Sequence, residues 1–250
     1  MKTMVSLELI KMRRRYFFLP IILFVGIGLL WCTVIALKEF SVSSDNKSIW
    51  LLINDLVIVN SMILPLLIGV MCSRLIEIEH RGKTFRVLQT SNQNIQELFY
   101  AKSLVAISII IVLGVIQAAY LIFVSSTNHL VFDFNLIIKF FISYFVASLF
   151  LVELHSALSL FIEKQSVGIF LAIVGSFIGL VSGGMLPNFV KLLLPWQYYA
   201  LLNPVNRVII NKKYIYQSNQ YYLIFIVVVI ALIIVELILI KKRLREMELC

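Results

Sequence analysis

The sequence is poor in charged residues and in cysteine, and each shortage excludes a class of protein. Only 14% of its 250 residues are charged while 61% are hydrophobic, and its mean hydropathy of +0.98 is far above that of soluble domains. Its three cysteines, Cys32, Cys72 and Cys250, are far apart and form no CxxC or Cys/His pattern. We therefore expect neither a disulfide scaffold nor a metal site. The net charge of +9 does not predict a nucleic-acid partner, because most basic residues flank apolar runs and contact anionic lipid there.

Apolar runs long enough to cross a bilayer occur six times. A hydrocarbon core of about 30 Å needs about 20 apolar residues in a helix. The first run is too long for the apolar part of a signal peptide, and no small-residue cleavage site follows it. The sequence therefore predicts an all-α membrane protein with one transmembrane domain over residues 1–250. The expected spans are residues 17–37, 51–72, 103–124, 136–161, 167–186 and 222–240.

The distribution of lysine and arginine predicts the orientation of the spans. With the N-terminus inside, the cytoplasmic segments hold 15 Lys/Arg and the outer segments hold 7. The positive-inside rule then favours an N-in, C-in topology in the cell membrane. Residues 1–16 interleave apolar residues with Lys11 and Arg13–Arg15, which predicts an interfacial helix on the inner leaflet. A disordered basic tail is the alternative for this segment.

The polar interval of residues 74–102, between spans two and three, is the most informative segment. It carries five Lys/Arg and three Glu, yet Phe85 and Leu88 keep helical spacing. We expect an amphipathic helix around residues 83–89, then a turn, then a second helix that starts at Asn94 with a capping box. A folded loop of this kind is typical of a segment that contacts a partner. The alternative is an amphipathic helix without a partner.

Two short motifs resemble parts of nucleotide-binding sites, and we reject both. HRGKT, residues 80–84, lacks the first glycine of a phosphate-binding loop, because Glu77 occupies that position, and no strand precedes it. VSGGM, residues 181–185, falls at the outer end of a span, where ATP is absent. No catalytic triad or metal cluster is apparent. We therefore expect that the chain is not an enzyme and holds no cofactor, so that another polypeptide binds any ATP and Mg²⁺.

Span four contains two ionisable residues that are candidates for a transport pathway, Glu153 and His155. A charge at the middle of a membrane helix costs roughly 2.5–3.5 kcal/mol, so Glu153 is expected to face protein or water. His155 lies about 200° further around the helix, so the two residues do not share a face. A proton relay and a structural, hydrogen-bonded Glu153 both remain open.

Span five carries Gly175, Gly179 and Gly183 at intervals of four residues, which places the three on one helix face. Glycine on such a face lets another helix backbone approach closely. The sequence leaves open whether that neighbour belongs to the same chain or to another subunit.

The outer segment of residues 187–221 is rich in aromatic residues and too short to span the membrane. We expect it to be re-entrant or to lie at the membrane interface. Trp196, Tyr198 and Tyr199 then either form part of an aromatic belt at the headgroups or act as an outer gate.

Together these features resemble the permease subunits of ABC-2 type transporters. The matching pattern comprises Glu77–Glu79, Gly82, Leu88–Ser91 and Lys102 at the start of span three. Within that family the chain looks most like permeases that protect lantibiotic producers. LHSALSLFIEKQSVG, the glycine-rich span five and LPWQYY carry this finer resemblance.

The resemblance implies an ATP-driven exporter in which two permeases, identical or paralogous, work with two ATP-binding subunits. It also implies that a coupling helix in the first cytoplasmic loop docks into the ATP-binding subunit and that Glu163 and Lys164 make a second cytoplasmic contact. The implied substrate is an amphipathic peptide such as a lantibiotic, expelled from the bacterial plasma membrane. The alternative is an ion-coupled secondary transporter or channel that uses Glu153 and His155. The implied coupling residues are Glu77, Glu79, Gly82, Phe85, Leu88 and Thr90.

Overall fold

The computed structural model describes residues 8, 12, 17–42, 47–82, 95–182, 186–210 and 213–249. Its long helices are α2 (Phe18–Val42), α3 (Ile49–Gly82), α5 (Ile95–Thr127), α6 (Phe134–Phe161), α7 (Gln165–Ser182) and α10 (Tyr222–Leu249). Between α7 and α10 lie α8 (Asn188–Leu193), the 3₁₀ helix η2 (Pro195–Gln197), α9 (Tyr198–Leu201), β1 (Val205–Ile210) and β2 (Lys213–Ser218).

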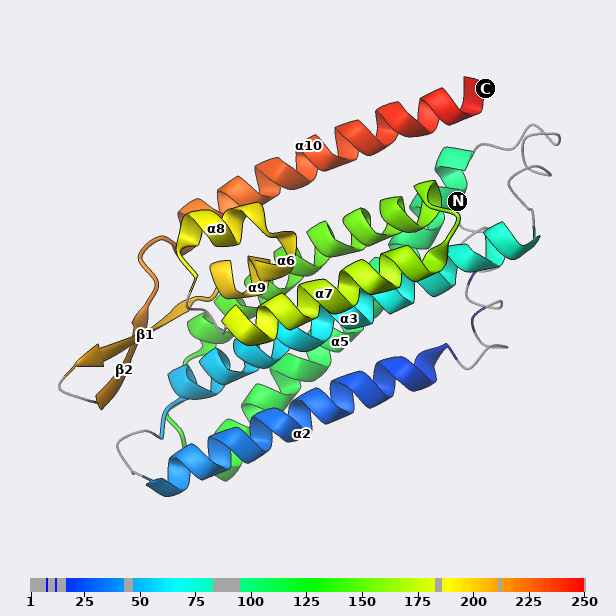
Figure 1. Ribbon diagram of the computed structural model, residues 1–250. Helices are drawn as coiled ribbons and strands as arrows, with labels where there is room; N and C mark the ends of the chain where they lie inside the picture. The colour runs from blue at the N-terminus through cyan, green and yellow to red at the C-terminus, as the bar shows by residue number, and fades with distance from the viewer. Residues whose placement is uncertain are drawn as a thin grey trace.

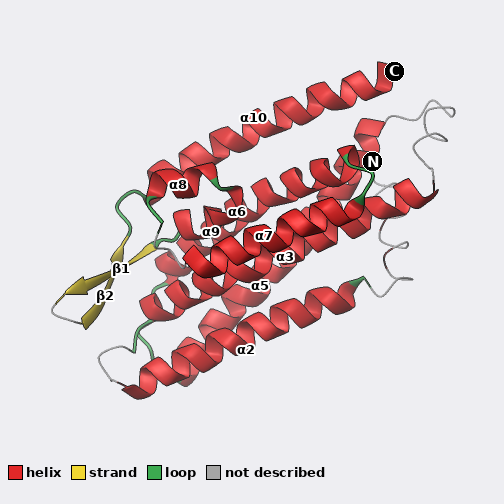
Figure 2. Cartoon of the chain, viewed as in Figure 1, coloured by secondary structure: helices red, strands yellow, loops and turns green. Residues whose placement is uncertain are grey.

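The long helices lie side by side in one bundle, with α2 and α10 on opposite sides of it (Figure 1). The end of α3, the start of α5, the turn between α6 and α7 and the end of α10 gather at one end of the bundle. We call this the inner end, after the predicted orientation. The β1–β2 hairpin projects from the opposite, outer end (Figure 2).

Burial shows that α3 is the centre of the bundle. Its most apolar window is 78% buried, against 22% for α2 and for α10. The helix packs against α2, α5, α6 and α7. Near its middle, Asn60 and Gln117 of α5 exchange two side-chain hydrogen bonds of 2.8 and 2.9 Å. By contrast α2 and α10 expose leucine, isoleucine and valine along their length, as expected of helices that face lipid.

Five helices are long and apolar enough to cross a membrane, namely α2, α3, α5, α6 and α10. They correspond to five of the six expected spans. The expected fifth span corresponds to α7, whose 18 residues extend only about 27 Å. It is shorter than the five helices named above, and residues 183–185, which follow it, lie outside the described residues. Six crossings therefore remain a prediction, and Gly183 at the end of that span lies outside the described residues.

The helices at the inner end run well beyond the expected spans. α3 continues from residue 72 to Gly82, and α5 begins at Ile95, next to the helix start predicted at Asn94. Hydropathy alone ends a span at its first charges. Here the extra turns persist because Ile95 and other apolar residues of the inner end form a second buried cluster. That cluster consists of Ile76, Ile95, Phe99, Ala157, Leu160, Ile240 and Leu244.

Within the predicted interfacial helix of residues 1–16 the structure describes Glu8 and Met12. Both are helical and buried, at 2% and 1% exposure. The rest of that prediction lies outside the described residues.

The antiparallel hairpin of β1 and β2 is an element that the all-α prediction did not include. Val205 pairs with Ser218 and Ile210 pairs with Lys213. The protein is nevertheless mostly helical. Just before the hairpin, η2 packs against α3, α6 and α7 and α9 packs against α3 and α6, so this part of the predicted outer segment enters the bundle (Figure 1). The short helix α8 packs against η2 and α9.

Candidate functional site

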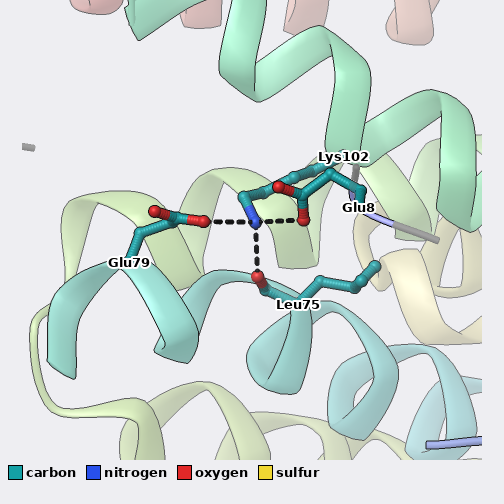
Figure 3. Close-up of polar contacts among 4 residues, drawn as sticks. All are labelled: Glu8, Leu75, Glu79 and Lys102. Carbon is teal, nitrogen blue, oxygen red and sulfur yellow. Dashed lines mark hydrogen bonds and ion pairs between the residues drawn. The ribbon is translucent and has the colours of Figure 1, made fainter. Parts of the chain in front are cut away.

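A buried ion-pair cluster joins three parts of the chain at the inner end (Figure 3). The Lys102 ammonium lies 2.7 Å from the Glu8 carboxylate and 3.1 Å from the Glu79 carboxylate. It also donates to the carbonyl oxygen of Leu75 at 2.8 Å. The three charged side chains are at most 3% exposed. We call Glu8, Glu79 and Lys102 the inner clasp.

One predicted coupling residue, Glu79, is a member of the inner clasp and lies inside the protein. Glu79 was expected at a contact with another subunit, but its carboxylate turns inward to Lys102. Glu77 is 30% exposed and pairs with Arg81 at 2.6 Å, one helical turn away. Gly82 is exposed and is the last residue of α3. Glu77 and Gly82 therefore lie at the surface beside the loop of residues 83–94.

The predicted coupling residues Phe85, Leu88 and Thr90 lie outside the described residues. The same holds for the amphipathic helix expected around residues 83–89. The structure does define where this loop is anchored, because α3 ends and α5 begins at the inner end beside the inner clasp.

The predicted second cytoplasmic contact lies on the exposed turn between α6 and α7. Glu163–Lys164 form part of this turn, and both residues are exposed. Hydrogen bonds fasten the turn to α3: His80 Nε2 donates to the Ser159 carbonyl at 3.0 Å, and Ser73 Oγ donates to the Gln165 side chain at 3.1 Å. The ends of α6 and α7 that flank this turn are therefore joined to α3 by hydrogen bonds.

The structure separates the two candidate pathway residues of α6. Glu153 is 4% exposed and accepts a hydrogen bond from Ser103 of α5 at 3.4 Å. His155 is fully buried and accepts a hydrogen bond at Nε2 from Trp196 Nε1, at 3.2 Å, while Gly69 of α3 lies against its ring. The two side chains point to different sides of α6, as the sequence predicted, and in the part of the chain that the structure describes no hydrogen bond joins them.

A second membrane carboxylate, Glu236 of α10, lies close enough to Glu153 for their charges to interact. Both of its carboxylate oxygens are buried and have no hydrogen-bond partner among the described residues. The sequence places Glu236 one turn before a basic cluster, which favours a side chain that extends to the inner interface. In the structure its carboxylate oxygens are instead buried, near Glu153 of α6. In the sequence, an acidic residue within an apolar run was the signal that could have identified Glu236 as a buried membrane carboxylate.

Of the three aromatic residues predicted at the outer gate, Tyr198 and Tyr199 are buried inside the bundle and Trp196 is half-buried. Tyr198 and Tyr199 are 2% and 3% exposed, and the Tyr199 hydroxyl forms a 2.7 Å hydrogen bond with Ser148 near the middle of α6. The Tyr198 ring packs edge-on against Phe150, with centroids 4.8 Å apart. Trp196 reaches His155, as described above. Such burial does not fit an aromatic belt at the headgroups, where the rings are exposed to lipid and water.

Two of the three glycines of span five make close contacts within the chain. A Cβ at Gly175 would overlap the indole ring of Trp196, and a Cβ at Gly179 would overlap the carbonyl oxygen of Ser61 in α3. The sequence analysis missed a further glycine, Gly69 of α3, whose Cβ would overlap that of Ala172 in α7. Small residues on both helices thus bring α3 and α7 together.

An apolar groove of about 280 Å³ lies between α2, α3 and α7. Ser176 supplies the one polar side chain of its lining. A groove of this chemistry accepts an aliphatic or aromatic group and offers almost no hydrogen bonds. The lining residues are Phe24, Ile27, Met62, Ile63, Leu66, Ile173, Ser176, Phe177 and Leu180.

A family model described as ABC-2 family transporter protein matches residues 4–179. This stretch is well over half of the chain, and it contains the inner clasp, α2, α3, α5 and α6. The chain belongs to the ABC-2 transporter family. Members of this family are membrane components of ABC transporters, so this ABC-2 protein is a multi-pass membrane protein that partners with an ATP-binding subunit. The chain has no detectable similarity to curated proteins or to solved structures.

The family match ends within α7, so the short helices α8, η2 and α9, the hairpin and α10 of this ABC-2 protein lie beyond it. In the part of the chain that the structure describes, no three His, Cys, Asp or Glu residues are grouped so that they could hold a metal ion.

Proposed function

We propose that the protein is the permease subunit of an ATP-driven exporter that removes an amphipathic, membrane-active peptide, such as a lantibiotic, from a bacterial plasma membrane. Family membership supports the transport role. The observation that supports this substrate class is the apolar groove between α2, α3 and α7. A peptide that already lies in the bilayer can place an apolar side chain in such a groove without leaving the lipid phase.

The proposed working unit contains two permeases, identical or paralogous, and two ATP-binding subunits. The partner subunits bind ATP and Mg²⁺. They dock on the loop of residues 83–94, with Phe85 and Leu88 as apolar anchors, and on the turn that contains Glu163 and Lys164. Apolar anchors with a charged rim are typical of energetically important contacts between proteins.

The helix α3 is suited to carry movement from the docking loop to the groove. It is one continuous helix from Gly82 to the groove residues Leu66 and Met62, a distance of about 24–30 Å along its axis. Pro65 lies beside those residues and removes a backbone hydrogen bond, which makes this the point where α3 bends most easily. A displacement at Gly82 is therefore expected to change the groove.

The close contacts of Gly69 and Gly179 make α3 and α7 move together. The third wall of the groove is α2, which contributes Phe24 and Ile27. We therefore expect the groove to open and close mainly by movement of α2 relative to the α3–α7 pair.

Reconstitution tests this function with a matched pair of variants on α7. Phe177 lines the groove, whereas Phe170 is exposed on the same helix outside the groove lining, at 62% against 63% exposure. In vesicles that also contain the ATP-binding subunit, ATP is expected to drive a fluorescent lantibiotic out of the membrane. Phe177→Ala is expected to slow this step while Phe170→Ala leaves it unchanged. Equal rates for the two variants would remove the groove from the substrate path, and a wild-type complex without ATP-dependent export would contradict the function.

A further inference from the structure

Two members of the inner clasp, Glu79 and Lys102, lie on either side of the proposed docking loop in the sequence. Glu79 lies three residues before the end of α3, and Lys102 lies two turns into α5. These two helices are the direct continuations of the loop of residues 83–94. The third member, Glu8, comes from the N-terminal segment, far away in sequence. The inner clasp therefore joins both anchors of the loop to the start of the chain (Figure 3).

The geometry of Lys102 makes this joint stiff. The ammonium group donates hydrogen bonds to Glu8 at 2.7 Å and to the Leu75 carbonyl at 2.8 Å, and it forms an ion pair with Glu79 at 3.1 Å. The cluster is shielded from water, where charge-assisted hydrogen bonds are stronger than on a surface. Removing one member of a buried ion pair is strongly destabilising, because the remaining charge has lost its compensation.

Two other ion pairs at the inner end differ from the inner clasp. Each of them joins two residues of one helix, and each is partly or largely exposed. Glu77–Arg81 lies on α3, and Arg243–Glu246 lies on α10. Exposed pairs of this kind contribute little to stability. The inner clasp, by contrast, holds separate segments together.

We propose that Lys102 is the positioning residue that makes the N-terminal segment move as one body with the two anchors of the docking loop. A movement imposed by the ATP-binding subunit then reaches the N-terminal segment at the same time as α3 and α5. The coupling part of this inference rests on the proposed function. The mechanical part, that Lys102 holds the N-terminal segment to α3 and α5, concerns this chain alone and is tested without a partner.

Cysteine labelling tests the mechanical part. Met12 lies four residues after Glu8 and is 1% exposed, so a cysteine there reports release of the N-terminal segment. Met12→Cys is introduced into a chain whose Cys32, Cys72 and Cys250 are replaced by alanine. Inside-out vesicles are then treated with a membrane-impermeant maleimide.

Lys102→Met is expected to speed this labelling by about tenfold or more, because the buried carboxylates of Glu8 and Glu79 lose the Lys102 ammonium group. The matched control is Arg243→Gln, which breaks an exposed pair at the same end and is expected to leave the rate unchanged. An unchanged rate in Lys102→Met would overturn the inference. If that variant does not accumulate, Glu8→Gln serves in its place, since Lys102 then keeps Glu79 and the Leu75 carbonyl. An unchanged rate in Glu8→Gln would overturn the inference equally.

The coupling part is tested in the complex with the ATP-binding subunit. Lys102→Met is expected to keep the subunit bound and hydrolysing ATP while the amount of peptide moved per ATP falls, and Lys102→Arg is expected to recover part of that ratio. If Lys102 had a purely structural role, the amount of bound ATP-binding subunit, the rate of ATP hydrolysis and the rate of transport would all fall together. Normal transport per ATP in Lys102→Met, despite fast labelling at position 12, would overturn the coupling role. Failure of the wild-type chain to bind any ATPase would instead defeat the proposed function and leave the labelling result standing.

Discussion

The contact between α3 and α7 gives the sharpest prediction about stability. At Gly179 a methyl group would overlap the carbonyl oxygen of Ser61, which belongs to the backbone and cannot turn aside as a side chain would. At Gly26 of α2 a methyl group would meet nothing within 4 Å. Gly179→Ala and Gly26→Ala are therefore the same chemical change in a crowded and in an open site.

The expected difference between the two variants is large enough to measure. Overpacking costs about 1–3 kcal/mol, which applies to Gly179→Ala. Replacing glycine by alanine in an open helical site favours the helix by up to about 1 kcal/mol, which applies to Gly26→Ala. The free energies of unfolding of the two variants should thus differ by about 1–4 kcal/mol, with Gly179→Ala the less stable.

Reversible unfolding of the purified protein in mixed micelles, driven by increasing fractions of SDS and followed by tryptophan fluorescence, measures this difference. The wild-type protein is expected to unfold between the two variants. Equal unfolding midpoints for Gly179→Ala and Gly26→Ala would refute the idea that α3 and α7 are held together by close backbone contact.

Two further predictions concern topology and the membrane carboxylate. In intact cells, a cysteine at Tyr214 on the hairpin should react with an impermeant maleimide and one at Arg245 should not; both positions are exposed, so labelling of Arg245 alone would reverse the topology. Glu153→Gln should transport at a near-normal rate, because the amide oxygen can still accept the hydrogen bond from Ser103. Complete loss of transport in a normally assembled Glu153→Gln variant would favour a proton-coupled mechanism.

The positions of the long helices follow from the sequence because apolar runs of bilayer length have one stable conformation in lipid. Their ends do not follow as well. Hydropathy ended the second span at residue 72, but α3 continues for ten more residues, since Leu75, Ile76 and Glu79 are buried at the inner end. The charged residues of that stretch are typical of a loop. In the structure, however, Glu77 pairs with Arg81 and Glu79 pairs with Lys102.

The inner clasp left no local signal in the sequence. Glu79 and Lys102 are separated by 23 positions, and Glu8 by a further 71 from Glu79, so only the fold brings them together. From the sequence alone, Glu79 is predicted to face another subunit. A glutamate at the cytoplasmic end of a span fits a surface site and a buried ion pair equally well.

The hairpin, in contrast, did have a signal that the sequence analysis overlooked. Val208, Ile209 and Ile210 are β-branched, and two residues separate them from the strand that begins at Lys213. Two short runs rich in β-branched and aromatic residues, separated by two residues, are typical of a β-hairpin. The many tyrosines drew attention to the membrane interface instead. The sequence draws attention to Trp196, Tyr198 and Tyr199, but their placement depends on partners such as Gly175 and Ser148 that only tertiary structure supplies.

The most direct measurement of the proposed role is ATP-dependent peptide expulsion by complexes made with the wild-type chain and with the Phe85→Ala/Leu88→Ala double variant. At helical spacing the two side chains share a face and can enter one groove of the partner. The double variant is expected to insert normally, to lose the copurifying ATP-binding subunit and to lose ATP-dependent expulsion. Wild-type levels of both in the double variant, or peptide expulsion by the wild-type chain driven by an ion gradient without ATP, would contradict the role of this chain as an ATPase-coupled permease.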